Sequence, residues 1–99
     1  MADRKNMVAT SPDYVGVLAQ MDGLRLAVSA RGASYLVQEP ASGGDWRTLR
    51  ELPLLRFLGQ WCFVNGVDLS PEFDAATDGL PDDPRDCLAI PYGGGKRPA

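Results

Sequence analysis

Residues 52–66, Leu-Pro-Leu-Leu-Arg-Phe-Leu-Gly-Gln-Trp-Cys-Phe-Val-Asn-Gly, form the densest run of large apolar side chains in this chain. Proline costs about 3 kcal/mol inside a helix and little at its first position, so this run predicts a helix that begins at Pro53. Asn65 and Gly66 are typical of a helix end. The apolar stripe at helical spacing contains Leu54, Phe57, Leu58, Trp61 and Cys62. We therefore expect residues 53–65 to be the core helix of the protein.

The opposite edge of this helix carries one large apolar residue, Phe63, within one turn of Gln60. Two alternatives are open for Phe63: the C-terminal part of the chain covers it, or it is an exposed anchor for a partner protein. Aromatic residues and arginine are enriched in interface hot spots. The helix-edge residues of the second alternative are Arg56, Gln60 and Phe63.

Upstream of this helix, two segments have the pattern of a β-hairpin. Residues 24–31, Leu-Arg-Leu-Ala-Val-Ser-Ala-Arg, alternate as in a strand with one buried face, which places Arg25 and Arg31 on the solvent face. Residues 34–39 predict a second strand, which Pro40 ends. Residues 46–50 either form a third strand or start the following helix, and Pro53 favours the strand.

The capping pattern of serine followed by proline and an acidic residue occurs twice. It predicts a helix over residues 12–21, with Ser11 as N-cap and Gly23 just beyond its end, and a helix over residues 71–77 capped by Ser70. Residues 81–84, Pro-Asp-Asp-Pro, suit neither helix nor sheet. Residues 86–90 are candidates for a further short strand.

These elements predict an α+β fold in the order α-β-β-β-α-α. A three-stranded antiparallel meander, or a four-stranded one if residues 86–90 join it, carries the helices at 12–21 and 53–65 on one face. A chain of 99 residues fits one domain, which we place at residues 11–92 between flexible tails at 1–10 and 93–99.

The composition excludes several kinds of chemistry. Histidine is absent, which excludes Ser-His-Asp and Cys-His catalysis and removes the commonest metal ligand. The acidic residues match no calcium-loop spacing. Cys62 and Cys87 are too few for a disulfide scaffold, although a single bridge between them is an alternative. We expect a protein that is not an enzyme and has no cofactor and no metal.

No stretch approaches the roughly 20 apolar residues of a membrane span, and we expect a cytoplasmic protein without a membrane partner. The bias towards Asp, Arg, Ala, Gly and Pro suggests a high-GC bacterial or phage genome.

The formal net charge of −3 is unevenly placed, because acidic side chains gather in residues 68–86. An acidic segment of this kind attracts basic surfaces and repels phosphate. We therefore expect a small accessory protein or inhibitor, from a phage or other mobile element, that presents residues 68–86 to a basic partner protein. Such a partner surface is one that normally holds nucleic acid. The acidic residues of this segment are Asp68, Glu72, Asp74, Asp78, Asp82, Asp83 and Asp86.

The alternative hypothesis is a nucleic-acid-binding module. If the predicted strands are adjacent, four arginines form a basic patch on one sheet face. The negative net charge argues against this hypothesis. These arginines are Arg25, Arg31, Arg47 and Arg50.

Overall fold

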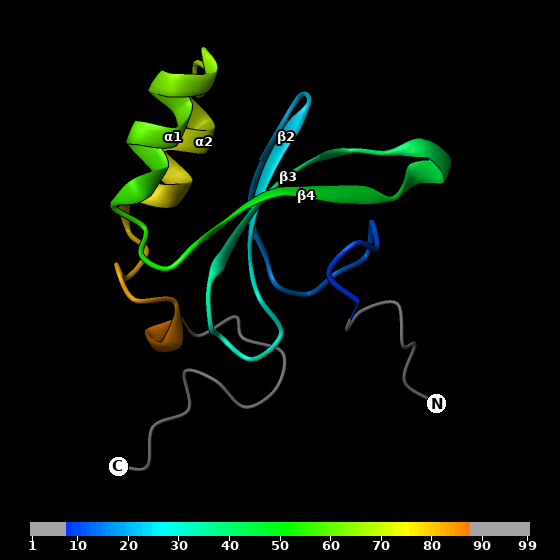
Figure 1. Ribbon diagram of the computed structural model, residues 1–99, viewed down its shortest axis with the longest axis horizontal. Helices are drawn as coiled ribbons and strands as arrows, with labels where there is room; N and C mark the ends of the chain where they lie inside the picture. The colour runs from blue at the N-terminus through cyan, green and yellow to red at the C-terminus, as the bar shows by residue number, and fades with distance from the viewer. Residues whose placement is uncertain (1–7, 88–99) are drawn as a thin grey trace.

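The computed structural model describes residues 8–87, and four strands in this range form one antiparallel meander in the order β1-β2-β3-β4 (Figure 1). The strands are β1 (Val17–Met21), β2 (Leu24–Val28), β3 (Tyr35–Pro40) and β4 (Trp46–Leu52). Two helices follow, α1 (Phe57–Asn65) and α2 (Pro71–Asp78). Short 3-10 turns occur at Ser42–Gly44 and Pro84–Asp86.

The α+β class predicted from sequence is confirmed, and the sheet has four strands. The tails predicted at residues 1–10 and 93–99 and the short strand predicted at 86–90 lie wholly or largely outside the described residues. No helix within residues 8–87 is long and apolar enough to cross a bilayer.

The helix predicted over residues 12–21 is wrong, because β1 occupies its second half. The side chain of Ser11 accepts a hydrogen bond from the N–H of Asp13 at 3.1 Å, which is a local turn rather than a helix cap. Asp22 and Gly23 connect β1 to β2, with Gly23 at φ 82°. An Asp-Gly pair between two strands is a strong hairpin signal, and it outweighed the capping pattern. The predicted order α-β-β-β-α-α is therefore wrong in its first element.

Residues 46–52 are a strand, as Pro53 indicated, but helix α1 begins at Phe57 and not at Pro53. Asp82 holds the intervening turn: its carbonyl oxygen accepts from the N–H of Leu55 at 2.8 Å, and its carboxylate accepts from the N–H of Arg56 at 2.9 Å. Helix α1 ends at Gly66, which adopts the left-handed conformation (φ 66°).

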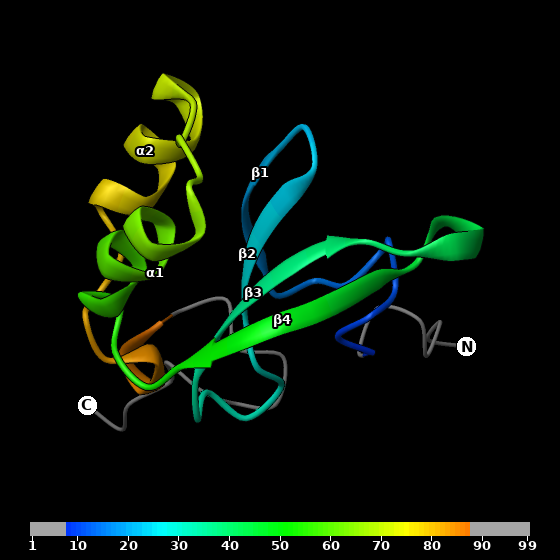
Figure 2. The same ribbon diagram turned by 45° about the horizontal axis from the view of Figure 1, so that its top comes forward.

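Helix α2 has the N-cap that the sequence predicted, because the Ser70 side chain accepts the N–H of Phe73 at 3.1 Å. Figures 1 and 2 both show α1 and α2 side by side at one side of the sheet. Helix α1 is the helix predicted at 53–65 with a later start, and α2 takes the place beside it that the sequence assigned to a helix at 12–21. The main core lies between these helices and the strands; its buried side chains include Leu24, Leu26, Val28, Tyr35, Val37, Leu52, Leu58, Cys62, Phe73 and Cys87.

The second face of the sheet is covered by residues 8–16, where the sequence predicted solvent. Tyr14 packs on Ala27 and Leu36 in a second buried cluster and donates its hydroxyl to the carbonyl of Val28 at 2.6 Å. All five residues of β2 are buried. The solvent-facing position predicted for Arg25 is therefore wrong, because the N-terminal segment runs across this face instead of forming a helix elsewhere.

Candidate functional site

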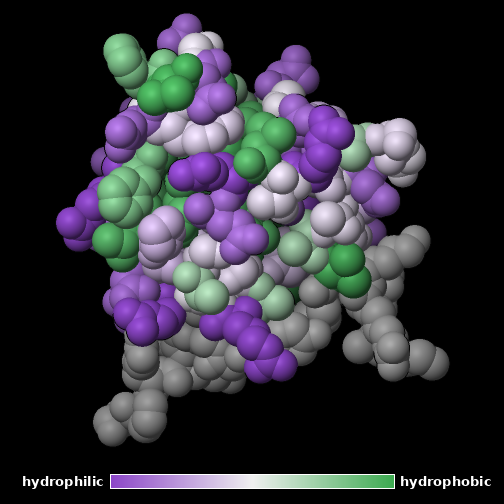
Figure 3. All heavy atoms as spheres, viewed as in Figure 1, coloured by the Kyte–Doolittle hydropathy of each residue, from purple (hydrophilic) through white to green (hydrophobic). Residues whose placement is uncertain are grey.

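Helix α1 is apolar on most of its circumference, yet only two of its residues, Leu58 and Cys62, are buried. Phe63 is 87% exposed and Val64 is 72% exposed, and Phe57 is exposed as well. Helices that are apolar on all sides are normally buried, so the outer face of α1 has the composition of a covered surface. Figure 3 shows hydrophobic side chains, in green, gathered over α1.

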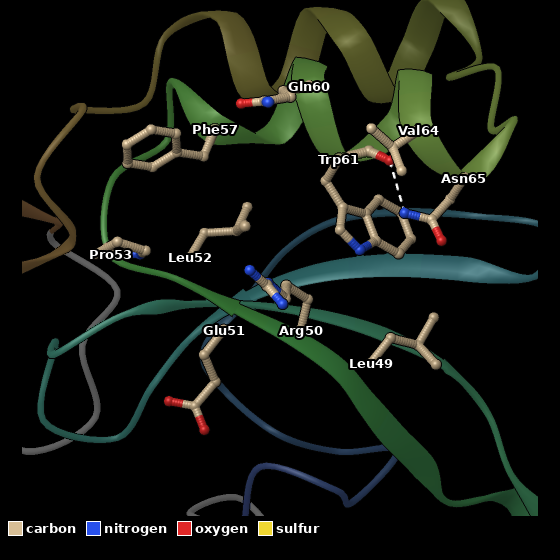
Figure 4. Close-up of a pocket in the computed structure, with 10 residues that line it drawn as sticks. All are labelled: Leu49, Arg50, Glu51, Leu52, Pro53, Phe57, Gln60, Trp61, Val64 and Asn65. Carbon is tan, nitrogen blue, oxygen red and sulfur yellow. Dashed lines mark hydrogen bonds between the residues drawn. The ribbon is translucent and has the colours of Figure 1, made fainter.

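A groove of about 650 Å³ lies between the end of β4 and helix α1 (Figure 4). The Arg50 guanidinium lies between the strand and the helix, whereas the Glu51 carboxylate points away from α1. The amide of Asn65 donates to the carbonyl of Trp61 at 2.8 Å. The residues that line the groove are Leu49, Arg50, Glu51, Leu52, Pro53, Phe57, Gln60, Trp61, Val64 and Asn65.

Within residues 8–87, arginine side chains form ion pairs with Asp82 and Asp83 of the acidic segment. Asp82 accepts from Nε and Nη2 of Arg56 at 2.9 and 2.6 Å, and this guanidinium lowers the pKa of the Asp82 carboxyl. Asp83 accepts from Nη2 of Arg85 at 2.8 Å, and this carboxylate raises the pKa of Arg85. The acidic surface predicted over the whole segment is therefore concentrated on its first part.

The remaining acidic side chains lie mostly on and just before α2. Four of these five, all except Asp86, make no ion pair within residues 8–87. Glu72 and Asp74 occupy the first turn of α2, where the positive end of the helix dipole favours negative charge. We call these four exposed residues the α2 acidic group: Asp68, Glu72, Asp74 and Asp78. Asp86 is exposed too and follows Arg85.

The three predicted helix-edge residues lie in different environments. Phe63 is exposed, as one alternative from the sequence had it, and Gln60 lines the groove. Arg56 lies just before α1 and is engaged by Asp82.

The four arginines proposed for nucleic acid do not share one exposed face. Arg25 is fully buried in β2, Arg47 is paired with Glu39, and Arg50 lines the groove. Arg31 is exposed in the turn between β2 and β3.

Arg25 is the centre of a buried polar network. Its Nε donates to Oε1 of Gln38 at 2.6 Å, and its Nη2 donates to the carbonyls of Ala9 and Ser11, each at 2.9 Å. The guanidinium carbon lies 4.5 Å from the centroid of the Trp46 ring, in cation–π geometry. Within residues 8–87 no carboxylate pairs with it, its Nη1 has no hydrogen-bond partner, and burial lowers the pKa of Arg25. The network fastens the N-terminal segment to the sheet.

The chemistry of the described residues is limited. Cys62 and Cys87 are both buried and free, so the alternative of a bridge between them is not what the structure has. Burial raises the pKa of the Cys62 thiol, which disfavours the nucleophilic thiolate. No cluster of three or more cysteine, histidine, aspartate or glutamate side chains suited to a metal ion occurs in residues 8–87.

Sequence reasoning missed the groove. It assigned Trp61 to the buried stripe, and it placed Leu49 only in the strand predicted at residues 46–50. One signal was available: α1 has too few polar residues to form a solvent face. No family model, curated protein or solved structure matches this chain.

Proposed function

We propose that this protein is a small protein-binding protein, an accessory factor or inhibitor without enzymatic activity, that acts on a partner with a basic surface. The observation that carries this proposal is the outer face of α1, where Phe63 and Val64 are exposed, on a helix that lies beside α2 with its acidic group (Figures 1 and 2). Large aromatic residues at the centre of an interface supply most of the binding free energy. Flanking charges set the choice of partner and the association rate.

The proposal extends to origin and location: the chain is a phage or mobile-element protein that acts in the bacterial cytoplasm. The surface of its partner is one that otherwise holds nucleic acid. The origin is supported by the composition biased towards Asp, Arg, Ala, Gly and Pro. The partner surface is supported by the acidic balance of residues 68–86, where the α2 acidic group has the charge sign of a phosphate backbone. The nucleic-acid-binding alternative has weaker support, because Arg25 is buried and Arg47 is paired with Glu39.

Affinity capture from a high-GC bacterial lysate tests the proposal. The bait is the full chain, compared with a variant in which the α2 acidic group is changed to Asn and Gln, and with Phe63→Ser. A matched control changes three exposed aspartates elsewhere, Asp13, Asp22 and Asp45, to Asn.

We expect one captured protein to be lost with both test variants and kept with the control, and to be released by added salt. Capture that survives both test variants would overturn the proposal. Salt-dependent binding of the purified chain to DNA or RNA would favour the alternative instead.

A further inference from the structure

We propose that the groove between β4 and α1 binds a short segment of the partner protein that combines apolar side chains with one carboxylate, which pairs with Arg50. This inference rests on the proposed function, because it assigns a second contact to the same partner. The groove is a different surface from the α2 acidic group. The groove would bind a carboxylate of the partner, whereas the α2 acidic group would contact basic side chains of the partner.

The charge of the groove selects the carboxylate. Arg50 is the one cationic side chain that lines it, and within residues 8–87 it makes no ion pair. Glu51 points away from the helix and leaves the guanidinium unopposed (Figure 4). A guanidinium presents a planar fork of donors that matches a carboxylate in two parallel hydrogen bonds.

The walls of the groove select the apolar part of the ligand. Phe57, Trp61 and Val64 come from α1, and Leu49 and Leu52 come from β4. Tryptophan, other aromatics and arginine are the residue types enriched at interface cores, and all three occur here. Gln60 and Asn65 supply polar groups at the helix side.

Exposure of these walls argues for a protein segment rather than a small molecule. Small-molecule sites bury most of the ligand inside a largely pre-formed cavity. Here Leu49 is 41% exposed and Phe57 is 40% exposed, and Val64 is exposed further still. A small ligand in the groove would leave much of these three side chains exposed to solvent. A protein partner can cover them together with Phe63 on the same helix.

The test is selection of a phage-displayed library of random peptides on the immobilised full chain. Synthetic versions of the enriched peptides are then titrated by fluorescence anisotropy against wild type and variants. We expect the enriched peptides to share an Asp or Glu among apolar residues. Arg50→Gln should weaken their binding about tenfold, the size of one charge-assisted contact, and Val64→Asp should abolish it. The matched control is Arg47→Gln, on the same strand but outside the groove lining, which should leave affinity unchanged.

In the peptide experiment, three results would overturn the inference: no enrichment, enriched peptides without an acidic residue, or equal affinity for wild type and Arg50→Gln. A concentration-dependent dimer in sedimentation velocity that Val64→Asp dissolves would assign the groove to a second copy, and also overturns it. Partner capture that depends on Phe63 and the α2 acidic group but is unaffected by Arg50→Gln would reject this inference and leave the proposed function standing.

Discussion

Arg25→Lys tests the buried network that fastens residues 8–16 to the sheet. Arginine serves three acceptors there through two nitrogens, Nε and Nη2, and stacks on Trp46. Lysine keeps the positive charge but offers one ammonium group and no planar face. The substitution therefore isolates the fork of hydrogen bonds from the charge.

The magnitude follows from the contacts that are lost. Nη2 alone serves the carbonyls of Ala9 and Ser11, so one ammonium group at that place leaves at least the Gln38 acceptor without its charged donor, a loss of about 1.5–3 kcal/mol. The lost cation–π contact adds about 0.5–2 kcal/mol. The desolvation cost of a buried cation is not relieved, because the charge remains and an ammonium is more strongly hydrated than a guanidinium. We expect the free energy of unfolding to fall by about 3 kcal/mol or more.

Equilibrium unfolding in urea, followed by far-ultraviolet circular dichroism, measures this loss. With a slope of about 1.5 kcal/mol per molar urea, the midpoint should fall by about 2 M. Arg47→Lys is the matched control, because Arg47 is an exposed arginine whose pair with Glu39 lies at the surface. It should change stability by less than about 0.5 kcal/mol. An Arg25→Lys protein within about 1 kcal/mol of wild type would refute the reasoning.

The other predictions concern single side chains. Phe63→Ser should cost only about 0.6 kcal/mol of stability, since about one eighth of a roughly 200 Å² side chain is buried, whereas Phe73→Ala should cost about 3–5 kcal/mol; urea midpoints compare them. The folded-state pKa of Asp82 is lowered, so its ion pair stabilises the protein above pH 3.8, the ordinary value, and this stability is lost as pH falls through the folded-state pKa. The urea midpoints of wild type and Asp82→Asn should therefore differ at neutral pH and converge in acid. Both cysteines are buried and free, so Ellman's reagent should modify them slowly in the native protein and rapidly in urea; fast native modification would contradict this.

The elements that could be predicted from sequence are those with one dominant local signal. Pro53 separated strand β4 from the helix that follows, and Ser70 capped α2 as expected. Residues 12–21 carried two competing signals, a capping pattern and the Asp22-Gly23 hairpin turn. The competition is settled by pairing with β2, which depends on residues outside the segment.

Arg25 shows why burial was harder to predict than secondary structure. Its alternation with apolar residues in β2 is the same whether the second face meets solvent or another segment of the chain. Its burial depends on acceptors from Ala9 and Ser11, which are local in neither sequence nor strand register. The groove was missed for a related reason, because it exists only where α1 packs beside β4. The position of Phe63 opposite the apolar stripe was predicted from one helix, but the sequence left open whether another part of the chain covers this side chain, which is 87% exposed.

The central claim is that the outer face of α1 contacts a partner protein. Photo-cross-linking tests it most directly, with p-benzoylphenylalanine in place of Phe63 and, as control, in place of Val15, which is 49% exposed in the segment that covers the opposite sheet face. In cells that contain the partner, position 63 should cross-link to one protein, in a peptide flanked by Lys and Arg, and position 15 should not. Identical products from both positions, or none from position 63, would contradict the claim.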